Sequence, residues 1–323
     1  MRSSFALGAA LVLAMLVSHA ALAQAWPNRP VRLLVPFAAG AGTNDIMARL
    51  VGQHLGAGLG QPVVIENRPG AGGIAGTDAA AKAAPDGYTF LMTNVSLVTS
   101  AYLYARLPYD PQKDFIPVTL VATAPLMLVV HPSVAAKSVQ ELVALAKANP
   151  GRLSYGSGGV GSTPHLSGEL FKSLAGIDAL HVPYKGGAPA LNDLVGGQLS
   201  FMIENVPGTM PFVKAGKLRA LAITSAQRSP LDPALPTMAE ADVPGYEVVG
   251  WNGLVAVAGT PPEIVARLQA EVGKVLRLPE VRERLAALGA EPVGSTPDEF
   301  GAFLRAEMTR WGRIIREKGI RSE

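Results

Sequence analysis

Three glycine-rich segments of the sequence have the residue types of a ligand site built from backbone groups. They span residues 36–45, 67–73 and 155–165, and each joins a predicted strand end to a predicted helix start. Glycine lets backbone N–H groups approach a ligand closely, and a helix N-terminus adds roughly half a positive charge. Such a segment is a candidate anion site that needs no cationic side chain. The first and third segments also offer hydroxyl groups, on Thr43, Ser157, Ser162 and Thr163.

A single glycine-rich turn can be no more than a tight loop. In open α/β sheets, however, ligands bind outside the carboxyl ends of strands. If the first and third segments belong to different lobes, they can close on one ligand. Their shared composition therefore favours binding over a purely structural role.

Known catalytic and nucleotide-binding motifs fit the sequence poorly. Gly70 and Gly72 with Ala75 match the loose dinucleotide-binding motif G-x-G-x-x-A, but no acidic residue closes a following strand at the required distance. The phosphate-binding motif G-x-x-x-x-G-K-[ST] is absent from the sequence. Ser157 is preceded two residues earlier by Tyr155 instead of glycine, which departs from the nucleophile elbow of hydrolases.

Isolated polar residues do not add up to a catalytic or metal centre. His165 and Glu169 lie one helical turn apart, but no third metal ligand is near them in the sequence, so a hydrogen-bonding histidine is favoured. His181 lies in an apolar strand and is predicted to be packed. Asp45 is predicted to stabilise the dipole of its helix. We predict no catalytic residue, no metal and no cofactor.

The elements around these segments alternate between strands and helices. Residues 31–35, 62–66 and 88–92 are predicted strands, and they are separated by helical patterns over 46–55 and 74–84. This β-α-β-α-β order implies a parallel sheet with right-handed crossovers. A second series follows, in which the predicted strands are 153–155, 180–182, 199–203 and 218–224.

Two long apolar stretches, 118–130 and 246–257, stand at the junctions of the two series. Two last helices begin at Thr260 and Thr296, each with Pro at the first position and Glu at the third. We expect these helices to return to the first lobe, so that the chain crosses between lobes twice, as in a hinge. The predicted fold is α/β with two lobes: residues 24–124 with 251–323, and residues 125–250.

The N-terminus has the pattern of a secretory signal peptide. Arg2 precedes an apolar run over residues 5–23, which ends in Ala21-Leu22-Ala23 before Gln24. The alternative is an uncleaved membrane anchor, but Ser18 and His19 break the run. Residues 1–23 are therefore predicted to be removed and the mature chain to be exported to the periplasm.

Composition excludes several classes of protein. The 323 residues include no cysteine, which excludes disulfide scaffolds, thiolate metal sites and cysteine nucleophiles. The net charge is +3, and basic and acidic residues are interspersed, so nucleic acid is not a predicted partner. A monomer is expected, since a cleft between lobes must open and close.

Short motifs along the whole mature chain resemble the substrate-binding receptors of tripartite tricarboxylate transporters, also called Bug receptors. In order they are Trp26-Pro27, Arg29-Pro30-Val31-Arg32, Val35-Pro36-Phe37, Asp45 with Ala48-Arg49, Asn67-Arg68-Pro69-Gly70-Ala71-Gly72-Gly73, Pro85-Asp86-Gly87-Tyr88-Thr89, His165-Leu166, Gly168-Glu169-Leu170-Phe171, His181-Val182-Pro183-Tyr184-Lys185-Gly186-Gly187, Ala220-Leu221-Ala222-Ile223-Thr224-Ser225, Pro236-Thr237 and Trp251. Each motif is short, but their order is specific.

The resemblance implies a periplasmic receptor of the "Venus flytrap" type, which binds a small carboxylate largely through backbone groups and ordered water. It also implies delivery of the ligand to membrane permease subunits. The first segment departs from the family pattern Pro-Phe-x-Pro-Gly-Gly. Ala39 replaces the proline, Ala41 replaces the second glycine, and Asn44 is inserted before Asp45.

The predicted ligand-binding residues come from both lobes. In the first lobe they are Phe37, Ala38, Gly40, Gly42, Thr43 and Asn94, and in the second lobe Ser157, Val160, Gly161, Ser162, Thr163, His165, Tyr184 and Asn205. Tyr184 and Asn205 could equally satisfy local backbone groups. Two other functions stay open: an exported serine-type hydrolase that uses Ser157 or Ser162 with His165 as the base, and a sensor subunit of a signalling system.

Overall fold

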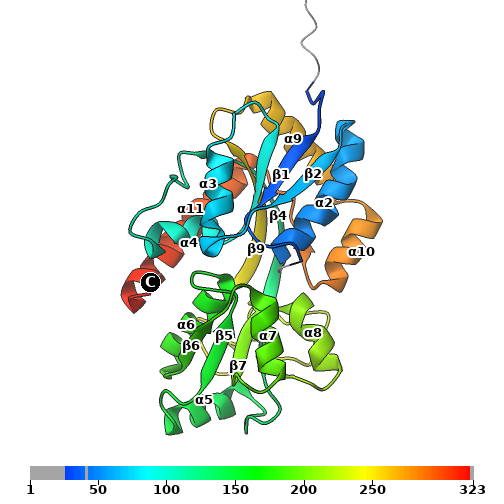
Figure 1. Cartoon of the computed structure of the whole chain (residues 1–323). Helices are drawn as coiled ribbons and strands as arrows, with labels where there is room; N and C mark the ends of the chain where they lie inside the picture. The colour runs from blue at the N-terminus through cyan, green and yellow to red at the C-terminus, as the bar shows by residue number, and fades with distance from the viewer. Residues whose placement is uncertain (1–25, 41–42, 321–323) are drawn as a thin grey trace, which may run out of the picture.

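The computed structural model describes residues 26–40 and 43–320, so the predicted signal peptide and Gly42 lie outside the described residues. Elements of lobe 1 are β1 (Val31–Val35), α2 (Thr43–Leu59), β2 (Val63–Asn67), η1 (Ala71–Gly73), α3 (Ile74–Ala81), β3 (Thr89–Thr93), α4 (Ser96–Leu103), α9 (Pro262–Val275), α10 (Pro279–Ala287), β10 (Glu291–Pro292) and α11 (Pro297–Lys318). Elements of lobe 2 are α5 (Val139–Ala148), β5 (Ser154–Ser157), α6 (Thr163–Ala175), β6 (Leu180–Pro183), α7 (Gly187–Val195), β7 (Phe201–Asn205), α8 (Val206–Lys214) and β8 (Arg219–Ile223). Two longer strands, β4 (Phe115–Val130) and β9 (Val249–Val257), run between the lobes (Figure 1).

The strands form one curled sheet in the order β2-β1-β3-β9-β4-β7-β5-β6. Strands β1, β2 and β3 are parallel in lobe 1, and β5, β6 and β7 are parallel in lobe 2. Strands β4 and β9 are antiparallel to each other and join the two parallel sets. The predicted α/β class with two crossover strands is confirmed.

Strand β4 changes partners along its length. Its residues 115–125 pair with β9, its residues 126–130 pair with β7, and its residues 127–130 pair with β8. The pairing with β9 has two register shifts, between Pro117 and Thr119 and between Leu120 and Ala122. The division of the chain at residues 124/125 and 250/251 stays a prediction, and β4 changes partner next to the first of these points.

The last helices return to lobe 1, as their position after the second crossover strand predicts. Helix α9 packs against α2, and α11 packs against α4 and β4. Thr296 begins α11 with a full capping box to Glu299. The matching prediction for α9 was wrong by one residue, because Pro261 is its N-cap and the Thr260 hydroxyl donates to the Val257 carbonyl at 2.8 Å.

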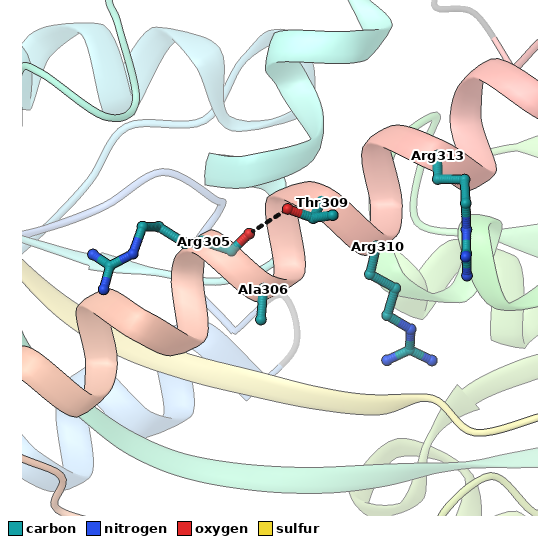
Figure 2. Close-up of a pocket in the computed structure, with 5 residues that line it drawn as sticks. All are labelled: Arg305, Ala306, Thr309, Arg310 and Arg313. Carbon is teal, nitrogen blue, oxygen red and sulfur yellow. Dashed lines mark hydrogen bonds between the residues drawn. The ribbon is translucent and has the colours of Figure 1, made fainter.

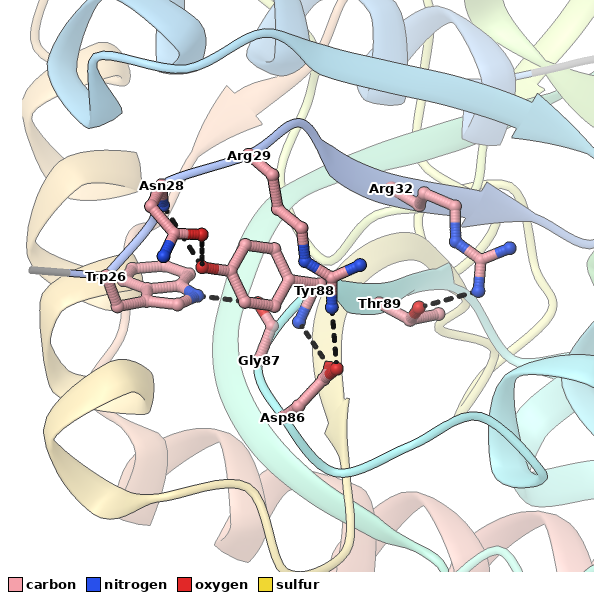
Figure 3. A network of polar contacts seen from close by, with 8 residues as sticks. All are labelled: Trp26, Asn28, Arg29, Arg32, Asp86, Gly87, Tyr88 and Thr89. Carbon is pink, nitrogen blue, oxygen red and sulfur yellow. Dashed lines mark hydrogen bonds and ion pairs between the residues drawn. The ribbon is translucent and has the colours of Figure 1, made fainter. Parts of the chain in front are cut away.

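A polar and aromatic network holds the start of the described chain against residues 86–88, which lead into β3 (Figure 3). Trp26 Nε1 donates to the Gly87 carbonyl at 3.0 Å, and the Tyr88 hydroxyl donates to Asn28 Oδ1 at 2.8 Å. Arg29 pairs with Asp86 at 2.8 Å while its guanidinium lies over the ring of Tyr88. These contacts hold the segment that leads into β1, whose far end carries the first glycine-rich segment. No helix of the described residues is both long and apolar enough to cross a membrane.

Candidate ligand site

A buried carboxylate holds the first glycine-rich segment. Asp45 is 2% exposed; its Oδ2 accepts from Gly40 N at 2.8 Å and Arg49 Nε at 2.9 Å, and its Oδ1 accepts from Asn67 Nδ2 at 2.8 Å. Burial alone would raise the pKa of Asp45, but hydrogen bonds from Arg49, Gly40 and Asn67 outweigh it and leave the pKa below its ordinary value. Asp45 therefore anchors the loop, beyond the dipole role that its position predicts.

The predicted residues of lobe 1 differ in their surroundings. Ala38 and Gly40 are exposed, and Thr43 is half-buried in the first turn of α2. A Cβ added to Gly73 would lie 3.3 Å from both Phe37 Cζ and Ser96 Oγ, so the Phe37 ring and the Ser96 hydroxyl meet at the second glycine-rich segment.

Two polar side chains lie where β3 leads into α4. The Oδ1 of Asn94 accepts from Ser96 N at 3.0 Å, so that side chain closes the turn before α4. The Oγ of Ser96 is buried and has no hydrogen-bond partner among the described residues. Ser96 is not among the predicted site residues, because the sequence pattern of residues 96–103 predicted no element.

The serine side chains of the third segment form hydrogen bonds with neighbouring groups of lobe 2. Ser157 is fully buried, and its Oγ lies 2.7 Å from His181 Nε2 and 3.2 Å from both Gly159 N and Gly159 O. The Ser162 hydroxyl donates to the Gly159 carbonyl at 2.7 Å and accepts from His165 N at 3.4 Å. The hydroxyls of Ser157 and Ser162, which the sequence offered as ligand groups, are thus engaged within the loop. Ser162, and not Thr163, is the N-cap of α6, and half-buried Thr163 is its first residue.

His165 and His181 form a stacked pair beneath this loop. Their ring centroids are 4.0 Å apart with an interplanar angle of 23°, and Tyr155 stacks on His181 at 4.9 Å. His165 Nδ1 accepts from Gly161 N at 3.0 Å. Burial lowers the pKa of His165 to about 4, and burial together with the neighbouring His165 lowers the pKa of His181 to about 3. Both rings are therefore neutral near pH 7, and His165 accepts its hydrogen bond from Gly161 N through Nδ1.

Protonation of this stacked pair is expected to destabilise the folded chain in acid. Below the ordinary histidine pKa of about 6.5, the unfolded chain binds more protons than the folded chain. The free energy of unfolding should therefore decrease as the pH is lowered, by about 3 kcal/mol between about pH 6.5 and pH 5. Urea unfolding at constant ionic strength measures this loss. The double variant His165→Asn/His181→Gln should lose clearly less, and an equal loss would contradict the assignment.

The third segment contacts lobe 1 through the described residues of α4 and η1. Thr99 Oγ1 donates to the Gly161 carbonyl at 3.4 Å. Gly161 has a φ of +80°, and a Cβ on it would lie 2.4 Å from Leu103 Cδ1. A Cβ on Gly72 would lie 3.6 Å from the Val160 carbonyl. Val160 therefore adjoins the second glycine-rich segment, and Gly161 adjoins α4. Closure of the first and third segments on one ligand stays a prediction.

Tyr184 and Asn205 are both engaged within lobe 2. The Tyr184 hydroxyl donates to Asp193 Oδ2 at 2.6 Å, and this bond is the main cause that raises the pKa of Tyr184 to about 12. Asn205 Nδ2 donates to Glu204 Oε1 at 2.5 Å. A Cβ on Gly250 would lie 3.5 Å from Asn205 Oδ1, so Asn205 adjoins the crossover strand β9.

A surface hollow of about 470 Å³ lies elsewhere, along α11 (Figure 2). Its walls are Arg305, Ala306, Thr309, Arg310 and Arg313. Two further hollows of about 420 and 410 Å³ lie beside α2 and beside α5. None of these three includes a predicted ligand-binding residue among its lining.

Known proteins of one receptor family match nearly the whole chain. A family model described as the tripartite tricarboxylate transporter family receptor matches residues 47–320. Protein BugT of Bordetella pertussis is 42% identical over 301 residues, which cover 93% of this chain and 92% of BugT. The structure of R. palustris Rpa4515 with adipate has a TM-score of 0.87 and 41% identity, over 92% of this chain and 99% of that chain. MatC (Rpa3494) from Rhodopseudomonas palustris with bound malate has a TM-score of 0.83 and 36% identity, over 90% and 100% of the two chains.

Proposed function

The chain belongs to the tripartite tricarboxylate transporter receptor family, and we propose that it is an exported receptor that captures a small carboxylate between its lobes. The bound receptor then delivers the carboxylate to the membrane permease of its transporter. The family consists of solute-binding proteins, and the relatives with adipate and malate support a carboxylate ligand. Export rests on the signal-peptide pattern of residues 1–23.

The observation that carries the proposal is the third glycine-rich segment. It lies at the carboxyl end of β5 and at the N-terminus of α6, and it touches α4 of the other lobe through Gly161. Its neighbours His165 and His181 are neutral, so the N-terminus of α6 is the main local source of positive electrostatic potential. A carboxylate held there needs backbone N–H groups and no cationic side chain.

One contact favours the hydrolase alternative. Ser157 Oγ and His181 Nε2 lie 2.7 Å apart, which is the separation of a nucleophile and its base. The base predicted for that alternative, His165, instead bonds to Gly161 N. Ser157 is also fully buried and bonded within its own loop, so its hydroxyl is not presented to a substrate. We therefore favour binding over hydrolysis. A sensor role would use the same site and would differ only in the partner that recognises the closed form.

A thermal-shift screen of the chain from Gln24 onward tests the proposal. The panel is about a hundred small carboxylates, including adipate and malate, with matched amides as uncharged controls. A ligand at about 100 times its dissociation constant adds about 2.7 kcal/mol of stability. Stabilisation by carboxylates alone, with the ligand recovered unchanged, is the expected result. Consumption of the ligand would favour the hydrolase, and stabilisation by the amides alone would contradict the anion site.

A further inference from the structure

Glu204 is a buried carboxyl group that the proposed function does not use. It lies at the end of β7 and is 6% exposed. Its Oε1 accepts from Asn205 N at 2.8 Å and from Asn205 Nδ2 at 2.5 Å. Its Oε2 is buried and has no hydrogen-bond partner among the described residues. A buried polar atom without a partner is costly, so Oε2 calls for a functional explanation.

The unpartnered oxygen faces the start of a helix. A Cβ added to Gly187, the first residue of α7, would lie 2.9 Å from Glu204 Oε2. Gly187 in turn adjoins the third glycine-rich segment, because a Cβ on Gly158 would lie 3.1 Å from Gly187 N. Glu204 Oε2 thus lies beside both the N-terminus of α7 and the loop that carries the proposed ligand site. The α7 N-cap, Gly186, supplies no side-chain bond to the helix.

The surroundings of Glu204 favour its neutral form. Burial is the largest influence on the carboxyl and raises its pKa, while the two bonds from Asn205 act in the opposite direction. Its partner across the sheet is Met127, and Met202 precedes it on the same face of β7. Neither these neighbours nor Gly187 and Asn205 can titrate. An ionised carboxylate beside a helix N-terminus would accept from the free N–H groups there, but Oε2 accepts from none of them.

We propose that Glu204 is a specificity-determining residue of the ligand site, which carries a proton on Oε2 and donates it to an acceptor oxygen of the ligand at the N-terminus of α7. This proposal rests on the proposed function, because it places the ligand at the loop over Gly187. A neutral carboxyl and helix N–H groups are all donors, so the subsite suits a carboxylate oxygen. It disfavours a ligand that brings an ammonium group to the same position.

Two variants of near-equal size test for a hydrogen-bond donor at this position. Glu204→Gln keeps a donor, and Glu204→Met removes it. Calorimetric titration of the mature chain with adipate and with malate should show Glu204→Gln within about threefold of the unchanged chain. Glu204→Met should bind about tenfold more weakly, which is about 1.4 kcal/mol. Glu283→Met, on the exposed face of α10, is the control for a surface substitution. Equal binding by Glu204→Met, or an equal loss in Glu204→Gln, would overturn the proposal.

A second measurement needs no ligand. The infrared difference spectrum between the unchanged chain and Glu204→Gln at pH 7 should contain the C=O stretch of a protonated carboxyl group. A difference spectrum with only carboxylate bands would overturn the proposal even if the ligand binds. If neither adipate nor malate binds the unchanged chain while the protonated band is present, then the proposed ligand class is wrong. The protonated state of Glu204 is supported in that case.

Discussion

Replacing Gly161 with valine is expected to weaken carboxylate binding about 100-fold, or about 2.7 kcal/mol. Gly161 has a φ of +80°, which a β-branched residue adopts only under strain. The added side chain would also meet Leu103 of α4, since the Cβ alone lies 2.4 Å from Leu103 Cδ1. Both effects act where the two lobes touch, so they raise the free energy of the closed form more than that of the open form. Calorimetric titration of the mature chain measures the loss.

Gly176 is the matched control for backbone strain. It has a φ of +62° at the end of α6, and a Cβ on it would meet nothing within 4 Å. Gly176→Val should therefore lose stability in urea unfolding through backbone strain alone and bind the carboxylate normally. If both variants bind equally well, the contact between the third segment and α4 does not belong to the ligand-bound form.

Replacing Glu307 with leucine is expected to lower the free energy of unfolding by about 3 kcal/mol. Glu307 lies in α11 and is 8% exposed; its Oε2 accepts from Trp251 Nε1 at 2.9 Å and from Trp311 Nε1 at 3.0 Å. Both tryptophans are buried, so the variant leaves two indole N–H groups without an acceptor, at about 1–3 kcal/mol each. Because Trp251 lies on β9, this network ties a crossover strand to the last helix.

Glu307→Gln serves as the comparison in the same urea unfolding experiment, because it keeps one side-chain oxygen as an acceptor. It should lose less than half as much stability as Glu307→Leu. Glu317→Leu, an exposed change on the same helix, should alter stability by less than about 0.5 kcal/mol. Equal stability of the chain with Glu307→Leu and the unchanged chain would show that the two indole contacts do not contribute.

Local sequence patterns predicted most of the fold. Strands followed by helices, and two long apolar stretches at the junctions, indicated two parallel sets joined by β4 and β9, as the sheet order confirms. The capping box at Thr296 placed the start of α11 correctly. Helix α4 was missed, because its residues 96–103 contain no charged residue and show no side-chain cap at their start.

The predicted site depended on contacts between distant residues, and these could not be derived from spacing. His181 pairs with Ser157 and stacks on His165 because β5 and β6 are adjacent, with Tyr155 opposite His181 in the register. Nothing local distinguishes that histidine from an ordinary packed residue. The neighbour of the third segment in the other lobe was a similar case. It is α4, which was not predicted and whose Thr99 and Leu103 contact Gly161.

Capture of a carboxylate between two lobes can be measured directly as a change in the distance between them. The chain has no cysteine, so cysteines placed at the exposed positions Gln53 in lobe 1 and Arg152 in lobe 2 allow specific spin labelling. Pulsed electron spin resonance then records the distance distribution, with and without the carboxylate that stabilises the chain most in the thermal-shift screen. We expect a shift to one shorter distance that saturates at the same concentrations as the thermal stabilisation. A distribution unchanged by a saturating carboxylate would contradict capture between the lobes.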